Sequence, residues 1–284
     1  MSGVRPTFGV LTPVTRDPYA TEEQATLEAA VRDGLIDALW VRDLPCAPEG
    51  DPDVGQGHDP FAHLAFLAGR GSLPAMTGVA SVVMGTRHPL VVARAAVGAQ
   101  VHSGGGFVLG LGSGGKPPVS AALGVGDRSL EQFIREWSAI WRALRGGSPD
   151  GSTFALPHEY RPPPMWLASD DADKWAAVGE TATGWLTFFA SPRTLLKAYE
   201  DVVAARGDAP AVGVRLDLRL VPVSDQPTVV APPVRGVVTC SLHQLGGVFR
   251  PMLNLPVGHL LLNLVGDHAG GLRHVHEVWH GRFG

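Results

Sequence analysis

A glycine-rich segment near the middle of the chain contains residue types that commonly surround a phosphate group. Residues 107–118 read FVLGLGSGGKPP. Gly110, Gly112 and Gly115 satisfy the dinucleotide-binding pattern G-x-G-x-x-G, and Gly110 to Lys116 satisfies the P-loop pattern G-x-x-x-x-G-K. The spacing suggests a dinucleotide, a nucleoside triphosphate or another molecule whose phosphate binds a glycine-rich turn.

The residues that follow the glycines argue against the first two ligands. A dinucleotide-binding turn opens a helix directly, so that the phosphates meet the helix N-terminus. Here Pro117 and Pro118 follow, and a proline disfavours helical geometry in the residue before it. A P-loop also requires Ser or Thr after its lysine, whereas Lys116 precedes Pro117. A glycine-rich turn after an apolar strand remains, and its alternative interpretation is close packing without a ligand.

A second motif, HEVWH at residues 276–280, matches the zinc-protease pattern H-E-x-x-H. On a helical wheel Leu272, Val275 and Trp279 belong to the buried stripe, which places His276 and His280 on the solvent side. The chain contains 11 histidines, so a chance match is the simpler interpretation. We therefore predict no metal site.

Composition narrows the class of protein further. The chain has 284 residues, of which 45% are hydrophobic and 18% charged, and its net charge is −4 with histidine neutral. It has no segment dense in Lys and Arg and no apolar run near the ~20 residues that span a bilayer, so we expect neither a nucleic-acid partner nor a membrane partner. Cys46 and Cys240 are too few for a disulfide scaffold, and no signal-peptide pattern is visible. These features predict a cytoplasmic protein.

The elements that must position the glycine-rich turn alternate regularly between strand-like and helix-like segments. The expected strands are residues 7–14, 37–43, 75–85, 107–112, 164–169, 184–189, 211–223 and 258–266. The expected helices are 21–34, 59–71, 88–105, 128–147, 170–182, 191–207, 239–253 and 267–281, with a Pro-rich loop over 224–235. Eight alternating units without a break in composition predict one domain, residues 1–284, folded as a (β/α)8 TIM barrel. A doubly wound open sheet is the main alternative.

The predicted barrel gives the glycine-rich turn a functional position. Loops after the carboxyl ends of the strands build the active sites of such barrels. The turn that begins at Gly112 follows the fourth expected strand. We therefore expect it at the catalytic face.

The region from the third to the fourth strand also resembles a known family. Residues 77–115, TGVASVVMGTRHPLVVARAAVGAQVHSGGGFVLGLGSGG, are similar to the luciferase-like flavin monooxygenases. Four further segments agree with one subgroup in order and spacing: GLIDALWVRDLP (34–45), DPF (59–61), GWLTF (184–188) and HLLLNL (259–264). The resemblance implies an eight-stranded barrel that holds a flavin at the strand ends and is usually a homodimer. It implies FMN as the cofactor, with the deazaflavin F420 as the alternative.

The resemblance also implies particular site residues. The Ala80–Ser81 peptide matches a bulge of the third strand, often cis, that supports the flavin ring. The residues that the resemblance places near the ring or its phosphate are Thr12, Ala80, Ser81, Val82, Gly112, Ser113, Gly114 and Ser169. The catalytic candidates are Arg42, Asp43 and His88. The alternative for His88 is a helix-start residue, because it precedes Pro89.

Several positions depart from the family's pattern. Gly106 stands where the family has Arg, Lys116 stands where the subgroup tends to have Arg, and Asp43 stands where many relatives have His. Asp170 and Asp171 follow Ser169, and carboxylates repel a phosphate unless they cap backbone amides or point away. The segment 235–241 lacks the arginines expected near the seventh strand. These departures remove positive charge around the presumed phosphate site.

Three functional hypotheses follow. The first is a flavin-dependent monooxygenase that acts on a small organic substrate with reduced FMN and O2, the reduced flavin being supplied by a separate flavin reductase. The second is an F420-dependent oxidoreductase on the same barrel. The third, which the departures favour, is a non-catalytic barrel that binds flavin weakly or not at all.

Overall fold

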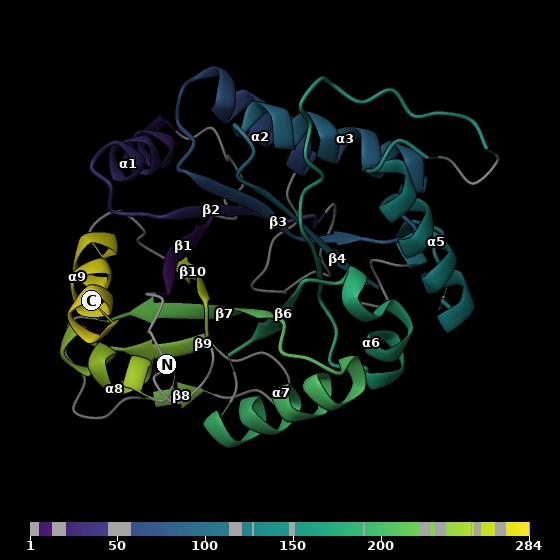
Figure 1. The fold of residues 1–284 in the computed structure, drawn as a ribbon. Coiled ribbons are helices and arrows are strands. Elements are labelled where there is room, and N and C mark those ends of the chain that lie inside the picture. Colours follow the sequence, from purple (N-terminus) through teal and green to yellow (C-terminus); the bar gives the residue numbers. More distant parts are fainter. Residues whose placement is uncertain are drawn as a thin grey trace.

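In the part of the chain that the structure describes, eight parallel strands close into a barrel (Figure 1). They are β1 (Thr7–Leu11), β2 (Ala38–Val41), β3 (Met76–Val83), β4 (Phe107–Gly112), β5 (Met165–Leu167), β6 (Gly184–Phe188), β7 (Ala211–Leu220) and β10 (His259–Leu264). Each strand pairs with the next, and β10 pairs with both β7 and β1. The predicted TIM barrel is therefore confirmed, and the open sheet is wrong.

The computed structural model describes residues 6–12, 21–44, 58–113, 121–126, 128–147, 151–189, 191–221, 228–230, 237–250, 252, 257–264 and 271–283. Within these ranges every helix is too short or too polar to cross a bilayer. Cys46, Gly114, Gly115 and Lys116 lie outside the described residues.

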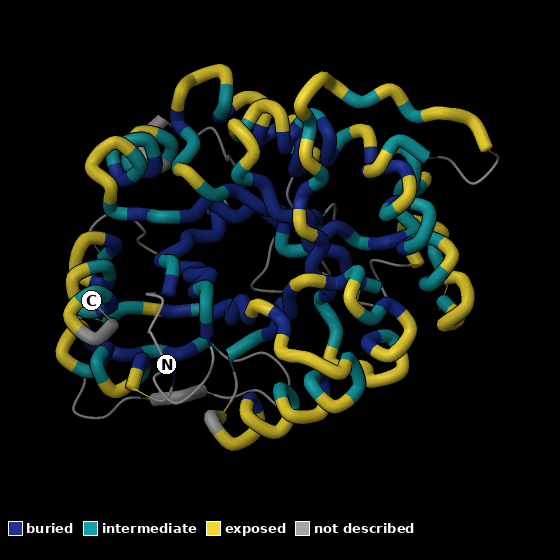
Figure 2. Tube along the Cα trace, viewed as in Figure 1, coloured by how far each residue is buried: buried dark blue, intermediate teal, exposed yellow. Residues whose placement is uncertain are grey.

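Helices surround the barrel and turn their buried sides toward the strands (Figure 2). They are α1 (Thr21–Arg32), α2 (Pro60–Gly69), α3 (Pro89–His102), α5 (Leu130–Ala143), α6 (Ala172–Val178), α7 (Pro192–Arg206), α8 (Leu245–Phe249) and α9 (Leu272–Phe283), with 3-10 turns η1 (Gly179–Thr181) and η2 (Leu242–Gln244). Side chains at the N-terminus cap several of these helices. Ser129 and Gln132 form a reciprocal capping box at α5, and Asp59 accepts two backbone N–H groups at the start of α2.

The segment between β7 and β10 differs from the sequence prediction. Strand β8 (Thr228–Val230) lies within the expected Pro-rich loop, and β9 (Val237–Cys240) overlaps the start of the expected helix. The reason is an edge that β7 leaves open: β6 pairs with β7 only as far as Arg215, and β9 pairs in parallel from Asp217 to Leu220. The β-branched residues of Val237–Cys240 suit this strand, and the helix begins only after it.

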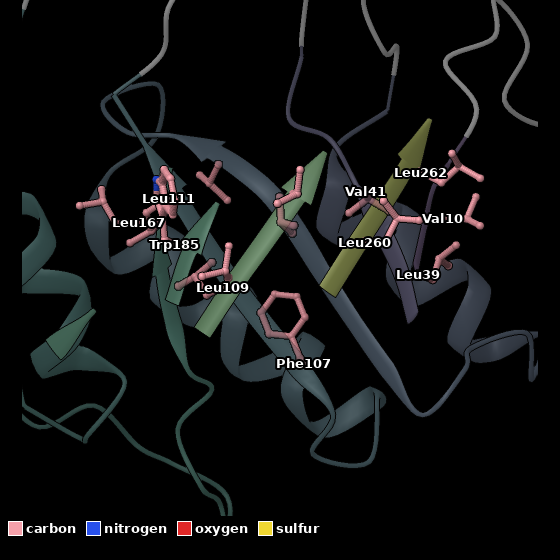
Figure 3. Close-up of a cluster of buried hydrophobic side chains, with 14 of the residues drawn as sticks. Val10, Leu39, Val41, Phe107, Leu109, Leu111, Leu167, Trp185, Leu260 and Leu262 are labelled. Carbon is pink, nitrogen blue, oxygen red and sulfur yellow. The ribbon is translucent and has the colours of Figure 1, made fainter. Parts of the chain in front are cut away.

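Alternate side chains of the strands build a core between the barrel and its helices (Figure 3). Successive residues of a strand point to opposite sides, so every second residue faces the helices. The residues labelled in Figure 3 are Val10, Leu39, Val41, Phe107, Leu109, Leu111, Leu167, Trp185, Leu260 and Leu262. All of them are buried, which fixes the strands, and hence their carboxyl ends, against the helix ring.

Two tryptophans fill the inside of the barrel. The ring centroids of Trp40 on β2 and Trp166 on β5 lie 5.6 Å apart. Glycines on the neighbouring strands make room for them: a Cβ on Gly78 would lie 2.3 Å from Trp40 Cζ3, and a Cβ on Gly184 would lie 2.4 Å from Trp166 Cε2. These glycines are therefore required by close packing, and the interior is a packed core beneath the rim.

Candidate functional site

The carboxyl ends of all eight barrel strands meet at one rim, because the strands are parallel. Arg42 and Asp43 follow β2, Ser113 follows β4, and Ser169 comes two residues after β5. The structure thus brings these four predicted residues to the same rim. Their roles toward a ligand stay predictions, and the geometry below describes what each side chain contacts.

The bulge expected in the third strand is present. The Ala80–Ser81 peptide is cis, and the pairing of β3 with β4 shifts register between Val79 and Val82. The opposite strand end lies close, since a Cβ on Gly112 would be 2.7 Å from Ser81 Oγ and 3.3 Å from Ala168 Cβ. Only glycine fits there. Val82 is fully buried in the outer core, so its side chain packs among apolar neighbours.

A lysine from the next helix reaches the end of β4. Lys174 Nζ on α6 donates a hydrogen bond to Ser113 Oγ at 3.2 Å. The same ammonium lies 3.3 Å from Asp171 Oδ2 and 5.5 Å from the centroid of the Phe133 ring. Its side chain is 18% exposed. Sequence reasoning missed this cation, because 61 residues separate Lys174 from Ser113.

The two aspartates after Ser169 are both engaged by other groups. Asp170 Oδ1 accepts hydrogen bonds from Trp185 Nε1 at 3.1 Å and Thr187 Oγ1 at 3.4 Å. Asp171 accepts the backbone N–H of Asp173 at 3.0 Å and so caps α6. Ser169 Oγ in turn accepts the N–H of Asp171 at 3.2 Å. Asp171 therefore has the capping role under which a phosphate nearby is tolerated, and the charge of Asp170 is stabilised by two side-chain donors.

An ion-pair network holds Asp43. Its carboxylate, in a residue that is 6% exposed, accepts hydrogen bonds from Arg87 Nη1, from Arg87 Nη2 at 2.9 Å and from Val83 N–H at 3.1 Å. Arg87 Nη2 also donates to Asp59 Oδ2 at 2.9 Å. The hydrogen bond to Asp43 raises the pKa of Arg87 above its ordinary value, although burial opposes this. The network joins the ends of β2 and β3 to the start of α2.

The remaining predicted residues occupy three different environments. Thr12 is buried beside β2, where its N–H donates to Trp40 O at 2.8 Å. Arg42 is 3% exposed, so its guanidinium group is buried at the end of β2. His88 is exposed, and its Nδ1 accepts the N–H of Leu90 at 3.2 Å as the N-cap of α3. The structure thus gives His88 the helix-start position that was its alternative interpretation.

A polar cluster on β7 and β10 was not anticipated from the sequence. Arg215 Nε and Nη2 donate to Asp217 Oδ1 at 2.9 Å and Oδ2 at 3.1 Å, and Asn263 Nδ2 donates to Asp217 Oδ1 at 2.7 Å. Arg215 also lies over the Phe188 ring, 5.2 Å from its centroid. The signal that could have revealed this cluster is the alternate spacing of Arg215, Asp217 and Arg219, three charges that share one side of strand β7.

The histidines of HEVWH pack against the barrel. The rings of His276 and His280 lie 4.0 Å apart, and His276 meets Phe8 edge-on at 5.5 Å. Both residues are half-buried, so their predicted position on the solvent side is only partly right. Over the described residues, no group of three His, Cys, Asp or Glu side chains is placed to hold a metal.

Comparisons with known proteins agree with this architecture. The sequence matches the family described as luciferase-like monooxygenase over residues 7–226. No curated protein matched the sequence.

Several solved structures share the fold. The EDTA monooxygenase EmoA from Chelativorans sp. BNC1 is 14% identical, with a TM-score of 0.70 over 99% of this chain and 95% of that one. The monooxygenase RslO1 from Streptomyces bottropensis is 15% identical, with a TM-score of 0.72 over 96% of each chain. The coenzyme F420-dependent tetrahydromethanopterin reductase from Methanopyrus kandleri is 13% identical, with a TM-score of 0.75 over 99% of this chain and 100% of that one.

Proposed function

Because this chain belongs to the luciferase-like monooxygenase family, we propose that it is a flavin-dependent oxidoreductase that oxygenates a small organic substrate with reduced FMN and O2. In this reaction one oxygen atom enters the substrate and the other leaves as water, while reduced FMN supplies two electrons. Residues 1–284 would form one cytoplasmic barrel domain that receives reduced flavin from a separate flavin reductase.

The observation that carries the proposal is the arrangement at the ends of β3, β4 and β5. The cis peptide Ala80–Ser81 lies beside the end of β4, where close contacts leave room only for a glycine at position 112. Ser113, the next residue, accepts a hydrogen bond from Lys174. A phosphate offers only hydrogen-bond acceptors and negative charge, so it needs donors and a cation. A hydroxyl and an ammonium within one hydrogen bond of each other meet that need.

The chain's own residues would divide the work as follows. Ser113 and Lys174 bind the phosphate, and the backbone around Ala80 and Ser81 supports the ring. Trp40 and Trp166 fill the barrel below and exclude water from that side. Arg42 and Asp43 fix the end of β2 beside the ring, with Asp43 held by Arg87 and therefore suited to positioning. The bound flavin supplies the redox chemistry.

The F420-dependent alternative has one observation in its favour. The cation at the end of β4 is Lys174, which already shares its charge with Asp171 at 3.3 Å. A single shared charge matches the phosphodiester of F420, which carries one negative charge, better than the phosphomonoester of FMN, which carries nearly two near neutral pH. The third hypothesis, a barrel that binds neither cofactor, rests on the departures such as Gly106.

A titration separates these hypotheses. The purified protein is titrated with FMN and with F420, and binding is followed by quenching of cofactor fluorescence and by the absorbance band of oxidised flavin. Saturable binding of FMN supports the proposal. Binding of F420 without FMN supports the deazaflavin alternative, and binding of neither at millimolar concentration would refute both in favour of the non-catalytic barrel.

The outer surface of two neighbouring helices supports a homodimer. Phe66 on α2 is 40% exposed, and Val91 and Val101 on α3 are 56% and 48% exposed. We propose that the outer surface of α2 and α3, which lie side by side (Figure 1) and expose these three apolar side chains, pairs with its copy. Sedimentation velocity tests this: the wild type should sediment as a dimer and Phe66→Glu as a monomer, whereas a monomeric wild type refutes it.

A further inference from the structure

Lys174 is built into the end of the barrel more firmly than an ordinary surface lysine. The chain has three lysines, Lys116, Lys174 and Lys197. Lys197 on α7 is 74% exposed and pairs with Asp201 one turn away. Lys174 is 18% exposed, and its ammonium contacts a different element of the fold, the Ser113 hydroxyl after β4. Ordering a long side chain costs conformational entropy, so a fixed position across two elements favours a role at that place.

The partners of Lys174 leave it able to take an anion. Ser113 is neutral and donates or accepts equally well, so its hydroxyl can turn toward a phosphate oxygen. Asp171 is 45% exposed, so water screens its attraction for the ammonium, and it has a second task as the cap of α6. Asp170 is held by Trp185 and Thr187 and does not compete for the ammonium.

A second cation lies at the same side of the rim. Arg128 covers Gly85, where a Cβ would lie 1.6 Å from Arg128 Nη2. Gly85 follows Met84, whose N–H donates to Gly112 O at 2.8 Å. Arg128 Nη1 pairs with Glu136, and its buried Nε has no hydrogen-bond partner among the described residues. Two cationic side chains therefore lie near the end of β4, Lys174 from α6 and Arg128 from the segment just before α5.

From this geometry we infer that Lys174 is the cation that binds the 5′-phosphoryl group of the flavin or deazaflavin, and that Asp171 holds it in the ligand-free protein. This inference rests on the proposed function. Lys174, which lies on α6, would thus supply the positive charge that arginines supply in the family's pattern. It also assigns Asp171 an opposing role, because its carboxylate competes with the phosphoryl group for the same ammonium.

The test compares each phosphorylated ligand with its core: FMN and riboflavin differ only in the phosphoryl group, and F420 and its deazaflavin differ in the phosphodiester tail. Dissociation constants are measured by fluorescence titration for FMN against riboflavin, and for F420 against the deazaflavin that lacks the phosphodiester tail. In Lys174→Met the dissociation constant of the phosphorylated ligand should rise roughly 10- to 100-fold, as expected for one charge-assisted hydrogen bond. The unphosphorylated ligand should change by less than about twofold, within the spread of distant surface changes. Lys174→Arg should retain most of the preference.

Asp171→Asn should change the dissociation constant of the phosphorylated ligand in the opposite direction. Asparagine caps a helix about as well as aspartate, so α6 is preserved while the competing charge is removed. We expect the phosphorylated ligand to bind about two- to fivefold more tightly, the range for a solvent-screened ion pair. Lys197→Met is the matched control, because it removes an exposed lysine whose ion pair with Asp201 lies within α7, and it should leave all dissociation constants unchanged.

The outcomes distinguish this inference from the proposed function. If the wild type binds FMN or F420 no better than the unphosphorylated partner, or if Lys174→Met weakens both members of a pair equally, Lys174 is not the phosphoryl cation while the proposed function stands. If none of the four ligands binds, the proposed function and this inference are both overturned. Thermal melting of each variant shows that the protein used in the titration is folded.

Discussion

Substituting Arg87 by Met should show how strongly the structure depends on the buried carboxylate of Asp43. Asp43 is 6% exposed and receives two hydrogen bonds from Arg87 and one from Val83 N–H. Methionine keeps an unbranched apolar side chain but removes every donor. The carboxylate would then remain buried beside a single backbone N–H, with its charge uncompensated.

The magnitude follows from the burial of the two partners. Removing one partner of a buried ion pair typically costs about 3–5 kcal/mol. The side chain of Arg87 is 21% exposed, so water can reach part of the vacated space, and we expect a loss of about 2–3 kcal/mol in the free energy of unfolding. For a chain of this length the melting temperature changes by about 2 °C per kcal/mol, which gives a decrease of about 4–6 °C.

The assay is thermal melting at pH 7 with two controls. Arg70→Met breaks the pair of Arg70 with Glu28, whose side chains are 49% and 17% exposed; because water screens this pair, the variant should melt close to the wild type. The double variant Asp43→Asn/Arg87→Met removes both charges and should recover much of the loss. If Arg87→Met melts no lower than Arg70→Met, or if the double variant is the least stable of the set, the reasoning about the buried carboxylate is wrong.

Two further predictions concern the barrel interior. Burial lowers the pKa of His259 to about 4 from 6.5, so the unfolded chain takes up its proton first, and the folded state should lose up to about 3 kcal/mol as the pH falls from 6.5 to 4. Urea unfolding at pH 7 and pH 4.5 should show a smaller loss for His259→Gln than for the wild type; equal losses would contradict the assignment. Gly78→Ala should abolish folding, since its Cβ would lie 2.3 Å from Trp40, whereas Gly98→Ala on α3 meets nothing within 4 Å and should stabilise by about 0.5–1 kcal/mol. Melting curves of both variants check this, and a Gly78→Ala variant that melts like the wild type would show that the interior is loosely packed.

Much of the fold was readable from the sequence because short apolar runs mark the strands and amphipathic stretches mark the helices. The apolar run that begins at Phe107 predicts strand β4, and the segment that begins at Thr21 predicts helix α1, each to within a few residues of its observed bounds. Family resemblance added the cis peptide at Ala80–Ser81, which the structure contains. The segment 237–240 was the exception. Its strand exists because β7 extends beyond β6, and no residue inside the segment reveals that open edge.

The candidate site was harder to predict from the sequence, because its charged side chains pair with residues that are distant along the chain. The sequence suggested a phosphate site without the family's arginines and with two aspartates beside it. In the structure Lys174 arrives from α6, and Asp170 and Asp171 are occupied by Trp185 and by the α6 backbone. Asp43 likewise finds Arg87, 44 residues away. The hydrogen bonds that decide each group's role join residues that only the closed barrel brings together.

The sequence by itself determined the alternation of strands and helices and the place of the glycine-rich turn directly after β4, because these depend on local periodicity. It predicted a parallel barrel with an open sheet as the alternative, and the pairing of β10 with β1 decided between them. Only the tertiary structure decided which charges stand beside that turn and which are neutralised. Electrostatic partners are selected by distance in space, and a closed barrel makes neighbours of residues that are far apart along the chain.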